Sequence, residues 1–245
     1  FCLSRGLGDV YKRQGLGISL RFLESGATVY ICGRSAPESL PSVPTHNGSN
    51  IAQFISADVR DLNQAQAMFD KIKTESGRLD VLVNNAGGAP PADAATASPR
   101  FSASIINLNL LAPITLAQMA NTLKQDQASG GSIINISSVA SYKPSALTTV
   151  YSAAKAGLNA LTSASAQEIA GVGVRVNCIV CGTFDTDAAA GFVRNPDTLP
   201  HVIEPIALNR VGEPEEVVGA VIYFASAASS YTTGTCMTID GGIRP

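Results

Sequence analysis

The feature that most constrains this chain is an alternation of short runs rich in β-branched residues with longer segments of helical periodicity. The runs predict strands at residues 28–32, 51–55, 81–83, 132–136, 174–180 and 236–239, and the segments predict helices at residues 17–25, 62–74, 102–123, 150–170 and 214–225. Nearly continuous apolar strands are typical of parallel strands that are buried on both faces. We therefore expect an α/β fold, a doubly wound parallel sheet with helices on both faces.

We expect a single domain, because the 245 residues contain no stretch that reads as a linker. Residues 35–50 carry three prolines and predict a surface loop. Residues 182–209 form the one long connection late in the chain. Loops that follow the carboxyl ends of parallel strands are where such folds bind ligands, so this connection is the predicted lid of a site.

The charge balance argues against polyanionic partners. Lysine and arginine number 17 against 19 for aspartate and glutamate, which gives a formal net charge of −2, and the basic residues do not cluster. Neither nucleic acid nor an anionic membrane surface would find a complementary patch. A small-molecule partner is the prediction that fits.

The sequence predicts neither a membrane span nor a secretory signal. Residues 101–123 and 217–239 lack charge but contain Ser, Thr or Asn throughout, and residues 1–14 lack a signal-like apolar run. The five cysteines are odd in number and scattered, and two histidines exclude a His-rich metal site. We predict a cytoplasmic protein with no metal.

Tyr151 and Lys155 lie four residues apart in a predicted helix, so they share one face. A neighbouring ammonium favours the phenolate, which makes a tyrosine a better acid-base catalyst near neutral pH. Ser138 follows the strand predicted at residues 132–136, at the sheet edge where ligands bind, and its hydroxyl could hold a substrate oxygen. Taken alone, a Tyr and a Lys at this spacing are more often a surface pair.

Further motifs stand in one order around this pair. They are NNAG at residues 84–87, Asn-Leu at 109–110, Ser138, YxxxK at 151–155, RVN at 175–177 and DGG at 240–242. Each is weak alone, but the set resembles the short-chain dehydrogenase/reductase family over residues 15–242. The resemblance implies a Rossmann-type sheet and a nicotinamide-dependent oxidoreductase that acts on a small carbonyl compound or alcohol.

The same resemblance implies roles for individual residues. Tyr151 would be the general acid-base, Lys155 would assist it and hold the nicotinamide ribose, and Ser138 would position the carbonyl. Asn109 would complete a catalytic tetrad. The cofactor would contact Gly15, Arg34, Asp58, Val59, Asn85, Ala86, Gly87, Tyr151, Lys155, Gly182 and Thr186.

Asn109 also has a local argument, because Pro113 has no N–H to donate to the Asn109 carbonyl. If the helix continues through the proline, that carbonyl is free to bind a water that relays protons from Lys155. A plain kink is the alternative, and the two are compatible. Asn84 has a similar alternative, since an Asn at a strand end often only caps a turn.

The start of the chain departs from the family pattern TGxxxGxG. Only Gly15 matches cleanly, as the third glycine, whereas Asp9 and Arg13 stand where the first two belong. Residues 1–14 show no β pattern, so we expect the first strand and glycine loop to be missing or altered, and this segment to be foreign to the domain at 15–245. A displaced remnant of the loop within it is the alternative.

Arg34 follows the strand predicted at residues 28–32, where an acid would bind the ribose hydroxyls of NAD and an Arg the 2′-phosphate of NADP. NADP(H) is therefore preferred and NAD(H) is the alternative, although a plain surface Arg would look the same. Asp58 resembles the adenine-contacting acid of the family, but it could equally cap the helix predicted at residues 62–74.

The segment CGTFDT at residues 181–186 departs from the family by a cysteine. Gly182 and Thr186 fit the family pattern, whereas Cys181 replaces its usual proline. With Cys178 it forms CxxC, but the motif lies at a strand end and has no second pair, so a redox or zinc role is not predicted.

Two classes of function stay open. The first is NADP(H)-dependent transfer of a hydride to a carbonyl or from a secondary alcohol, with a 3-oxoacyl-thioester reductase as the alternative substrate class. The second is a catalytically dead, truncated or cofactor-sensing protein, because the glycine loop is altered while the tetrad is intact. A serine hydrolase fails because GxSxG is absent from the sequence. Fluorescence titration with NADPH distinguishes the oxidoreductase from the second class.

Apolar residues cover nearly every side of the helix predicted at residues 102–123, and one sheet can bury only one side. We therefore predict a symmetric homodimer, or the homotetramer of such dimers that the resemblance suggests. A monomer whose loops cover the outer side is the alternative. Light scattering at micromolar concentration distinguishes the oligomer from the monomer, because a measured mass equal to that of one chain would exclude the predicted interface.

Overall fold

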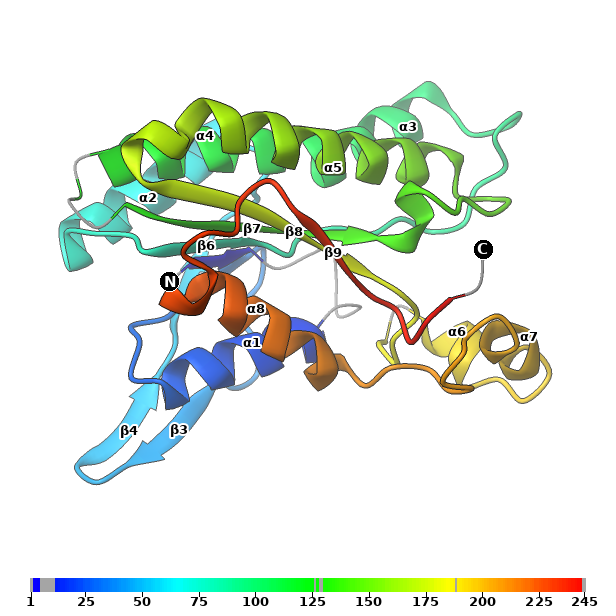
Figure 1. Ribbon diagram of the computed structural model, residues 1–245, viewed down its shortest axis with the longest axis horizontal. Helices are drawn as coiled ribbons and strands as arrows, with labels where there is room; N and C mark the ends of the chain where they lie inside the picture. Colours follow the sequence, from blue (N-terminus) through cyan, green and yellow to red (C-terminus); the bar gives the residue numbers. More distant parts are fainter. Residues whose placement is uncertain (1, 5–11, 126, 128–129, 188, 244–245) are drawn as a thin grey trace.

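The computed structural model describes residues 2–4, 12–125, 127, 130–187 and 189–243. A seven-stranded sheet lies between two helical layers (Figure 1). The strands follow the order β5-β2-β1-β6-β7-β8-β9, and neighbours pair in parallel throughout. Their bounds are Cys2–Ser4 (β1), Tyr30–Gly33 (β2), Gln53–Ser56 (β5), Val81–Asn84 (β6), Gly131–Ser138 (β7), Val174–Cys181 (β8) and Cys236–Ile239 (β9). The predicted doubly wound α/β fold is confirmed.

Helices cover both faces of the sheet (Figure 1). One face carries α2 (Leu62–Ser76), α3 (Pro99–Ile106), α4 (Ala112–Gln125) and α5 (Thr149–Ile169), and the other carries α1 (Lys12–Glu24) and α8 (Val218–Ala225). Each face has its own buried apolar cluster, which includes Phe69 and Leu116 on the first and Phe22 and Phe224 on the second. Two cores explain why the strands are so apolar.

Strand β8 shows how one strand supplies both cores. Val174 and Val176 belong to the cluster that contains α2 and α4, whereas Ile179 and Cys181 belong to the cluster that contains α1 and α8. Successive side chains of a strand point to opposite faces of the sheet. A strand between two helical layers therefore needs an apolar residue at nearly every position, not at every second one.

The expectation of a missing first strand is wrong. Cys2–Ser4 pairs with β2 on one side and β6 on the other, and Leu3 stands opposite both Ile31 and Val83. A strand inside a sheet satisfies its backbone groups on both edges, so a short segment can hold this place without a strong side-chain pattern. Of the altered glycine loop, the position of Asp9 lies outside the described residues, whereas Arg13 and Gly15 lie in α1 (Lys12–Glu24).

The segment at residues 35–50 is not the irregular loop that its prolines predict. It contains an antiparallel hairpin of β3 (Ser42–Thr45) and β4 (Gly48–Ile51), which projects from the main sheet (Figure 1). Both strands of a two-stranded ribbon are edge strands, where a proline such as Pro44 is tolerated because one row of backbone groups faces away from the partner. Helix α1 likewise begins earlier than residue 17, at Lys12.

The helix predicted at residues 102–123 continues through Pro113, but not as a uniform α-helix. A π-helical turn at Asn107–Leu111 joins α3 to α4, and in it the N–H of Ala112 donates to the carbonyl of Asn107, five residues back. Pro113 follows this turn and is buried. A wider turn is one way for a helix to accommodate a residue that cannot donate.

By length and composition alone, Pro99–Gln125 could cross a membrane. In the fold its inner side packs toward the sheet, where Leu108, Ala112 and Leu116 are buried in the same apolar cluster as residues of α2. A core helix passes the same test of length and hydropathy. The segment therefore gives no reason to infer a membrane span.

The RVN motif fastens the last helix to the sheet. Arg175 donates from Nη1 to Ser229 Oγ and from Nη2 to the carbonyl of Phe224, both at 2.8 Å. Asn177 donates from Nδ2 to the carbonyl of Thr232 at 2.8 Å. These bonds join β8 to the end of α8 and to the turn that precedes β9.

Replacing Arg175 by methionine should lower the free energy of unfolding by about 2 to 3 kcal/mol, because charged hydrogen bonds to partly buried acceptors are lost. Urea denaturation measures this change. Arg21→Met is the control, since Arg21 forms only an exposed pair with Glu24 on α1. It should cost less than about 0.5 kcal/mol. If both substitutions lowered the free energy of unfolding equally, the RVN motif would not be what holds α8 against the sheet.

Candidate active site

The carboxyl ends of the parallel strands bring most of the predicted site residues to one edge of the sheet. Gly33 ends β2, Asn84 ends β6, Ser138 ends β7 and Cys181 ends β8. In an open parallel sheet this edge is the one that binds ligands. Residues that are far apart in the sequence therefore meet here.

Lys155 lies buried between α5 and β7. Its Nζ donates to the carbonyl of Ile136 at 2.7 Å and lies 5.7 Å from the centre of the Tyr151 ring. Burial lowers the pKa of Lys155 to about 8, because desolvation disfavours the ammonium. The spacing of the two residues on α5 thus places a buried cation beside a phenol.

Gly87 leaves the space in which Lys155 and Asn109 come together. A Cβ atom at Gly87 would lie 2.9 Å from Asn109 Oδ1 and 3.0 Å from Lys155 Nζ. Neither side chain has room to retreat, because both are buried and hydrogen-bonded. Close approach, rather than an unusual backbone angle, therefore requires glycine at this position.

The side chain of Asn109 holds the loop that follows β6. Its Nδ2 donates to the carbonyls of Gly88 and Ile105 at 3.0 Å each, and its Oδ1 accepts from the N–H of Gly88 at 2.8 Å. The sequence argument concerns only the main-chain carbonyl of Asn109 and misses this clamp. Asn109 and Gly88 stand 21 positions apart, and no local pattern joins them.

Ser138 lies where β7 passes into the single helical turn Val139–Ser141. Its Oγ accepts from the N–H of Ala140 at 3.2 Å, and the residue is partly exposed. This bond uses an oxygen lone pair, so the O–H of Ser138 can still donate to a ligand.

A chain of hydrogen bonds crosses the sheet beneath the NNAG motif. Asn84 Nδ2 donates to Asn135 Oδ1 on β7, and Asn135 Nδ2 donates to Thr162 Oγ1 on α5, both at 2.9 Å. Asn84 therefore links β6 to its neighbours, a contact that local turn chemistry does not predict. It ties the start of the loop to the helix that carries Tyr151.

Asn85 differs from its neighbour. Both polar atoms of its amide are buried and have no hydrogen-bond partner within the described part of the chain. A buried amide without partners is costly, and few native structures retain one without a ligand, water or ion to satisfy it. The position therefore fits a contact to a polar ligand.

Two arginines approach Asp58 after β5. Arg60 donates from Nε to Asp58 Oδ1 at 2.9 Å and from Nη2 to Oδ2 at 2.5 Å. The hydrogen bond from Arg60 lowers the pKa of Asp58, and the charge of Arg34 adds to the shift. The alternative that Asp58 caps α2 is wrong, because Asp61 accepts the N–H groups at the helix start. Arg60 is not among the residues predicted from the sequence, although its place two residues after Asp58 was a signal.

Gly182 allows β8 to end against the DGG segment. A Cβ atom there would lie 2.6 Å from Cα of Asp240, so no side chain fits. Thr186 is buried a few residues later, and its N–H donates to the carbonyl of Phe184 at 2.8 Å. Both lie on the connection that leaves the ligand-binding edge.

The remaining predicted cofactor contacts offer main-chain rather than side-chain groups. Val59 and Ala86 are buried in the apolar cluster that contains α2 and α4. Gly15 lies in the first turns of α1, and its carbonyl accepts from Ser19 Oγ at 2.7 Å. The stretch before α1 lies outside the described residues.

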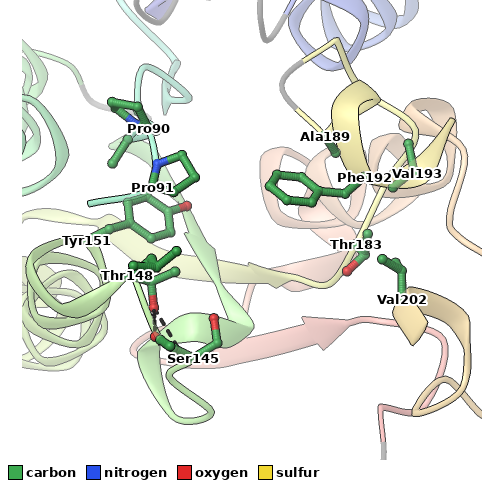
Figure 2. Close-up of a pocket in the computed structure, with 15 residues that line it drawn as sticks. Pro90, Pro91, Ser145, Thr148, Tyr151, Thr183, Ala189, Phe192, Val193 and Val202 are labelled. Atoms are coloured by element: carbon green, nitrogen blue, oxygen red, sulfur yellow. Dashed lines mark hydrogen bonds between the residues drawn. The ribbon is translucent and has the colours of Figure 1, made fainter. Parts of the chain in front are cut away.

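A cavity of about 710 Å³ opens beside Tyr151, a size usual for small-molecule sites. Figure 2 shows Pro90, Pro91 and Tyr151 on one side of it, with the hydroxyl of Tyr151 turned toward the open space. Thr183 and the short helices α6 (Ala190–Val193) and α7 (Leu199–Ile203) supply the opposite wall. The long connection after β8 thus does line a site.

The two cysteines of CxxC point to opposite faces of β8. Cys178 Sγ donates to Asn159 Oδ1 on α5, whereas Cys181 Sγ accepts from Gln14 Nε2 on α1, both at 3.5 Å. Burial raises the pKa of Cys181 to about 11. Cys178 stands in register with Cys236 of β9 instead. Across the described residues, no group of three or more His, Cys, Asp or Glu side chains could hold a metal ion.

Comparisons with known proteins agree with this geometry. A family model described as enoyl-(acyl carrier protein) reductase matches residues 14–244. A curated relative, the 3-oxoacyl-[acyl-carrier-protein] reductase FabG of Chlamydia muridarum, is 35% identical over 237 residues that cover 94% of this chain and 92% of the relative. The chain belongs to the short-chain dehydrogenase/reductase family, and it is an NAD(P)-dependent oxidoreductase.

Solved structures give the same fold. A short-chain type dehydrogenase/reductase from Mycobacterium marinum has a TM-score of 0.86 and 28% identity, with 99% of this chain and 94% of that chain covered. A gluconate 5-dehydrogenase from Burkholderia cenocepacia, solved with NADP and tartrate, has a TM-score of 0.86 and 25% identity, with the same coverage.

Proposed function

We propose that this protein transfers a hydride between NADP(H) and a carbonyl carbon or secondary alcohol, with Tyr151 as the general acid-base. The observation that carries the proposal is the buried ammonium of Lys155, which lies 5.7 Å from the centre of the Tyr151 ring. Tyr151 in turn lines a cavity of small-molecule size. A cation in that position favours the phenolate form of the tyrosine, which brings its reactivity toward neutral pH. We further propose that the enzyme works in the cytoplasm.

The residues present suit the dinucleotide at both ends. Near the cavity, the buried amide of Asn85, which has no partner among the described residues, and the main chain at Gly87 would face the nicotinamide half, with Thr186 on the opposite side. At the far end, Arg34 and Asp58 would hold the adenosine half. The nicotinamide, when bound, supplies or accepts the hydride.

The chain's own groups would manage the proton and the substrate oxygen. Ser138 would donate its hydroxyl to the carbonyl oxygen and fix its position. Tyr151 would give its proton to that oxygen in reduction and take it back in oxidation. Lys155 would support the phenolate, and a water on the main-chain carbonyl of Asn109 would pass the proton onward.

Arg34 favours NADP(H) over NAD(H). It is exposed at the end of β2, near enough to Asp58 for its charge to lower the pKa of that carboxyl group. The carboxylate of Asp58 is already held by Arg60, which leaves the guanidinium of Arg34 for a 2′-phosphate. The NADP bound in the Burkholderia structure supports the same choice.

A 3-oxoacyl thioester is the second candidate substrate class, and the similarity to FabG of Chlamydia muridarum is the observation that favours it. Such a substrate has a carbonyl group that Ser138 and Tyr151 could receive in the same way. The two candidates therefore share one mechanism and differ in what fills the cavity.

Tyr151→Phe should reduce NADPH-dependent turnover by about 10²- to 10⁴-fold, because only the acid-base hydroxyl is removed. The dissociation constant of NADPH, followed by fluorescence, should stay within about threefold, since the ring remains. Tyr231→Phe is the matched control, because Tyr231 is fully exposed. Turnover of the Tyr151 variant within tenfold of wild type would refute the catalytic role. Failure of the wild type to bind NADPH would favour the catalytically dead alternative.

Arg34→Asp should shift the cofactor preference from NADPH toward NADH by about 100-fold, because a carboxylate repels the 2′-phosphate and accepts from ribose hydroxyls. The measured quantity is the ratio of kcat/KM for the two cofactors. Arg21→Asp introduces the same charge change at an exposed position on α1 and should leave the ratio unaltered. An unchanged ratio in the Arg34 variant would reduce Arg34 to an ordinary surface residue.

A further inference from the structure

Among the described residues, no charged side chain lines the cavity beside Tyr151. The lining consists of Gly, Ala, Pro, Leu, Val and Phe residues and of four side chains with a hydroxyl group, those of Ser145, Thr148, Tyr151 and Thr183. On this basis we propose that the substrate is an uncharged, largely apolar ketone, or the matching secondary alcohol, with a bulky apolar substituent. The inference rests on the proposed function for its reaction, but its argument concerns only what fills the cavity.

Two apolar walls face each other across the cavity (Figure 2). Pro90 and Pro91 form part of one wall, and Phe192, Val193 and Val202 form part of the other. Phe192 keeps 51% of its surface exposed, although it is a large apolar side chain. Its burial against an apolar ligand would be favourable, because apolar surface would be removed from water.

Leu147 adds a second exposed apolar group to this site. It has a φ of 66°, a left-handed backbone that a residue other than glycine rarely adopts, and its carbonyl accepts from the N–H of Ala92 at 3.0 Å. The side chain lines the cavity and is 49% exposed. Strained residues gather where function requires their position, and here the strained residue presents a leucine to the ligand.

The polar groups of the lining are few, and one is already engaged. The hydroxyl of Thr148 donates to the carbonyl of Ser145 at 2.7 Å and lies 2.9 Å from the hydroxyl of Ser152. The proposed function uses Tyr151 and the nearby Ser138 for the reacting oxygen, so the side chains of Ser145 and Thr183 would meet any other polar group of the substrate. A polyhydroxylated substrate would leave most of its hydroxyl groups against apolar carbon, which is costly.

Two described cations near the cavity, Arg194 and Lys155, are already engaged by protein groups. Arg194, next to Val193, donates from Nε to Asp185 Oδ1 at 2.7 Å and from Nη2 to Asp187 Oδ1 at 3.4 Å. Lys155 lies behind Gly87 and donates to the carbonyl of Ile136. A carboxylate or phosphate in the cavity would lose its hydration without gaining a partner.

The test compares ketones of one shape that differ in charge or polarity. Benzylacetone should bind the full-length protein at least about 100-fold more tightly than its para-carboxylated analogue, measured by calorimetry, because the added carboxylate is left unpaired. Fructose, an uncharged polyhydroxylated ketone, should bind no better than the carboxylated analogue. With NADPH present, kcat/KM should follow the same order.

A cation on the wall that contains Phe192 should reverse the preference for the uncharged ketone over the carboxylated one. Phe192→Arg should improve binding of the carboxylated ketone relative to benzylacetone by about tenfold or more, because it supplies the missing cation. Val172→Arg is the control, since Val172 is exposed, lies in the 3-10 turn after α5 and is not among the cavity-lining residues. It should change neither affinity.

Each result decides between the two claims. Equal binding of the two benzylacetones, tighter binding of the charged compound or of fructose, or binding of none of them would overturn the substrate class. Tight binding of benzylacetone without NADPH-dependent reduction would support the substrate class and refute the proposed reductase. Reduction of the charged ketone with equal or higher kcat/KM would support the reductase and refute the substrate class.

Discussion

The burial of one ammonium group organises this site. Lys155 donates to the carbonyl of Ile136 in β7, and its Nζ stands against Gly87, where Asn109 Oδ1 also arrives. A buried cation is costly unless it is hydrogen-bonded, so the strand, the loop after β6 and the helix that carries Asn109 must keep their mutual positions. The same constraint fixes Tyr151 one helical turn away and thereby defines the inner end of the cavity.

That constraint can be met only because the sheet is rigid and covered on both faces. Asn84, Asn135 and Thr162 connect β6, β7 and α5 through buried hydrogen bonds, and Arg175 and Asn177 tie β8 to the end of α8. Close packing then holds the carboxyl ends of the strands in fixed positions relative to one another. The loops that carry the predicted site residues therefore begin at rigidly held strand ends, and a precise site requires such support.

The site divides into a polar inner end and an apolar outer end. The inner end holds Lys155, Asn109 and the unpartnered amide of Asn85, whereas Pro90, Pro91 and Phe192 surround the outer end. The polar end suits the cofactor that the proposed function places there, and the apolar end suits the uncharged ketone proposed as the substrate.

The sequence by itself determined the layered fold and the set of motifs at one sheet edge, because apolar runs, helical spacing and YxxxK are local patterns. Long-range contacts decided the rest. The first strand is held by backbone bonds to β2 and β6, and the clamp of Asn109 on Gly88 joins distant segments. Only the tertiary structure could reveal the cavity, because its two walls come from segments that are distant in the sequence, such as those of Pro90 and Phe192, and that meet across the sheet edge.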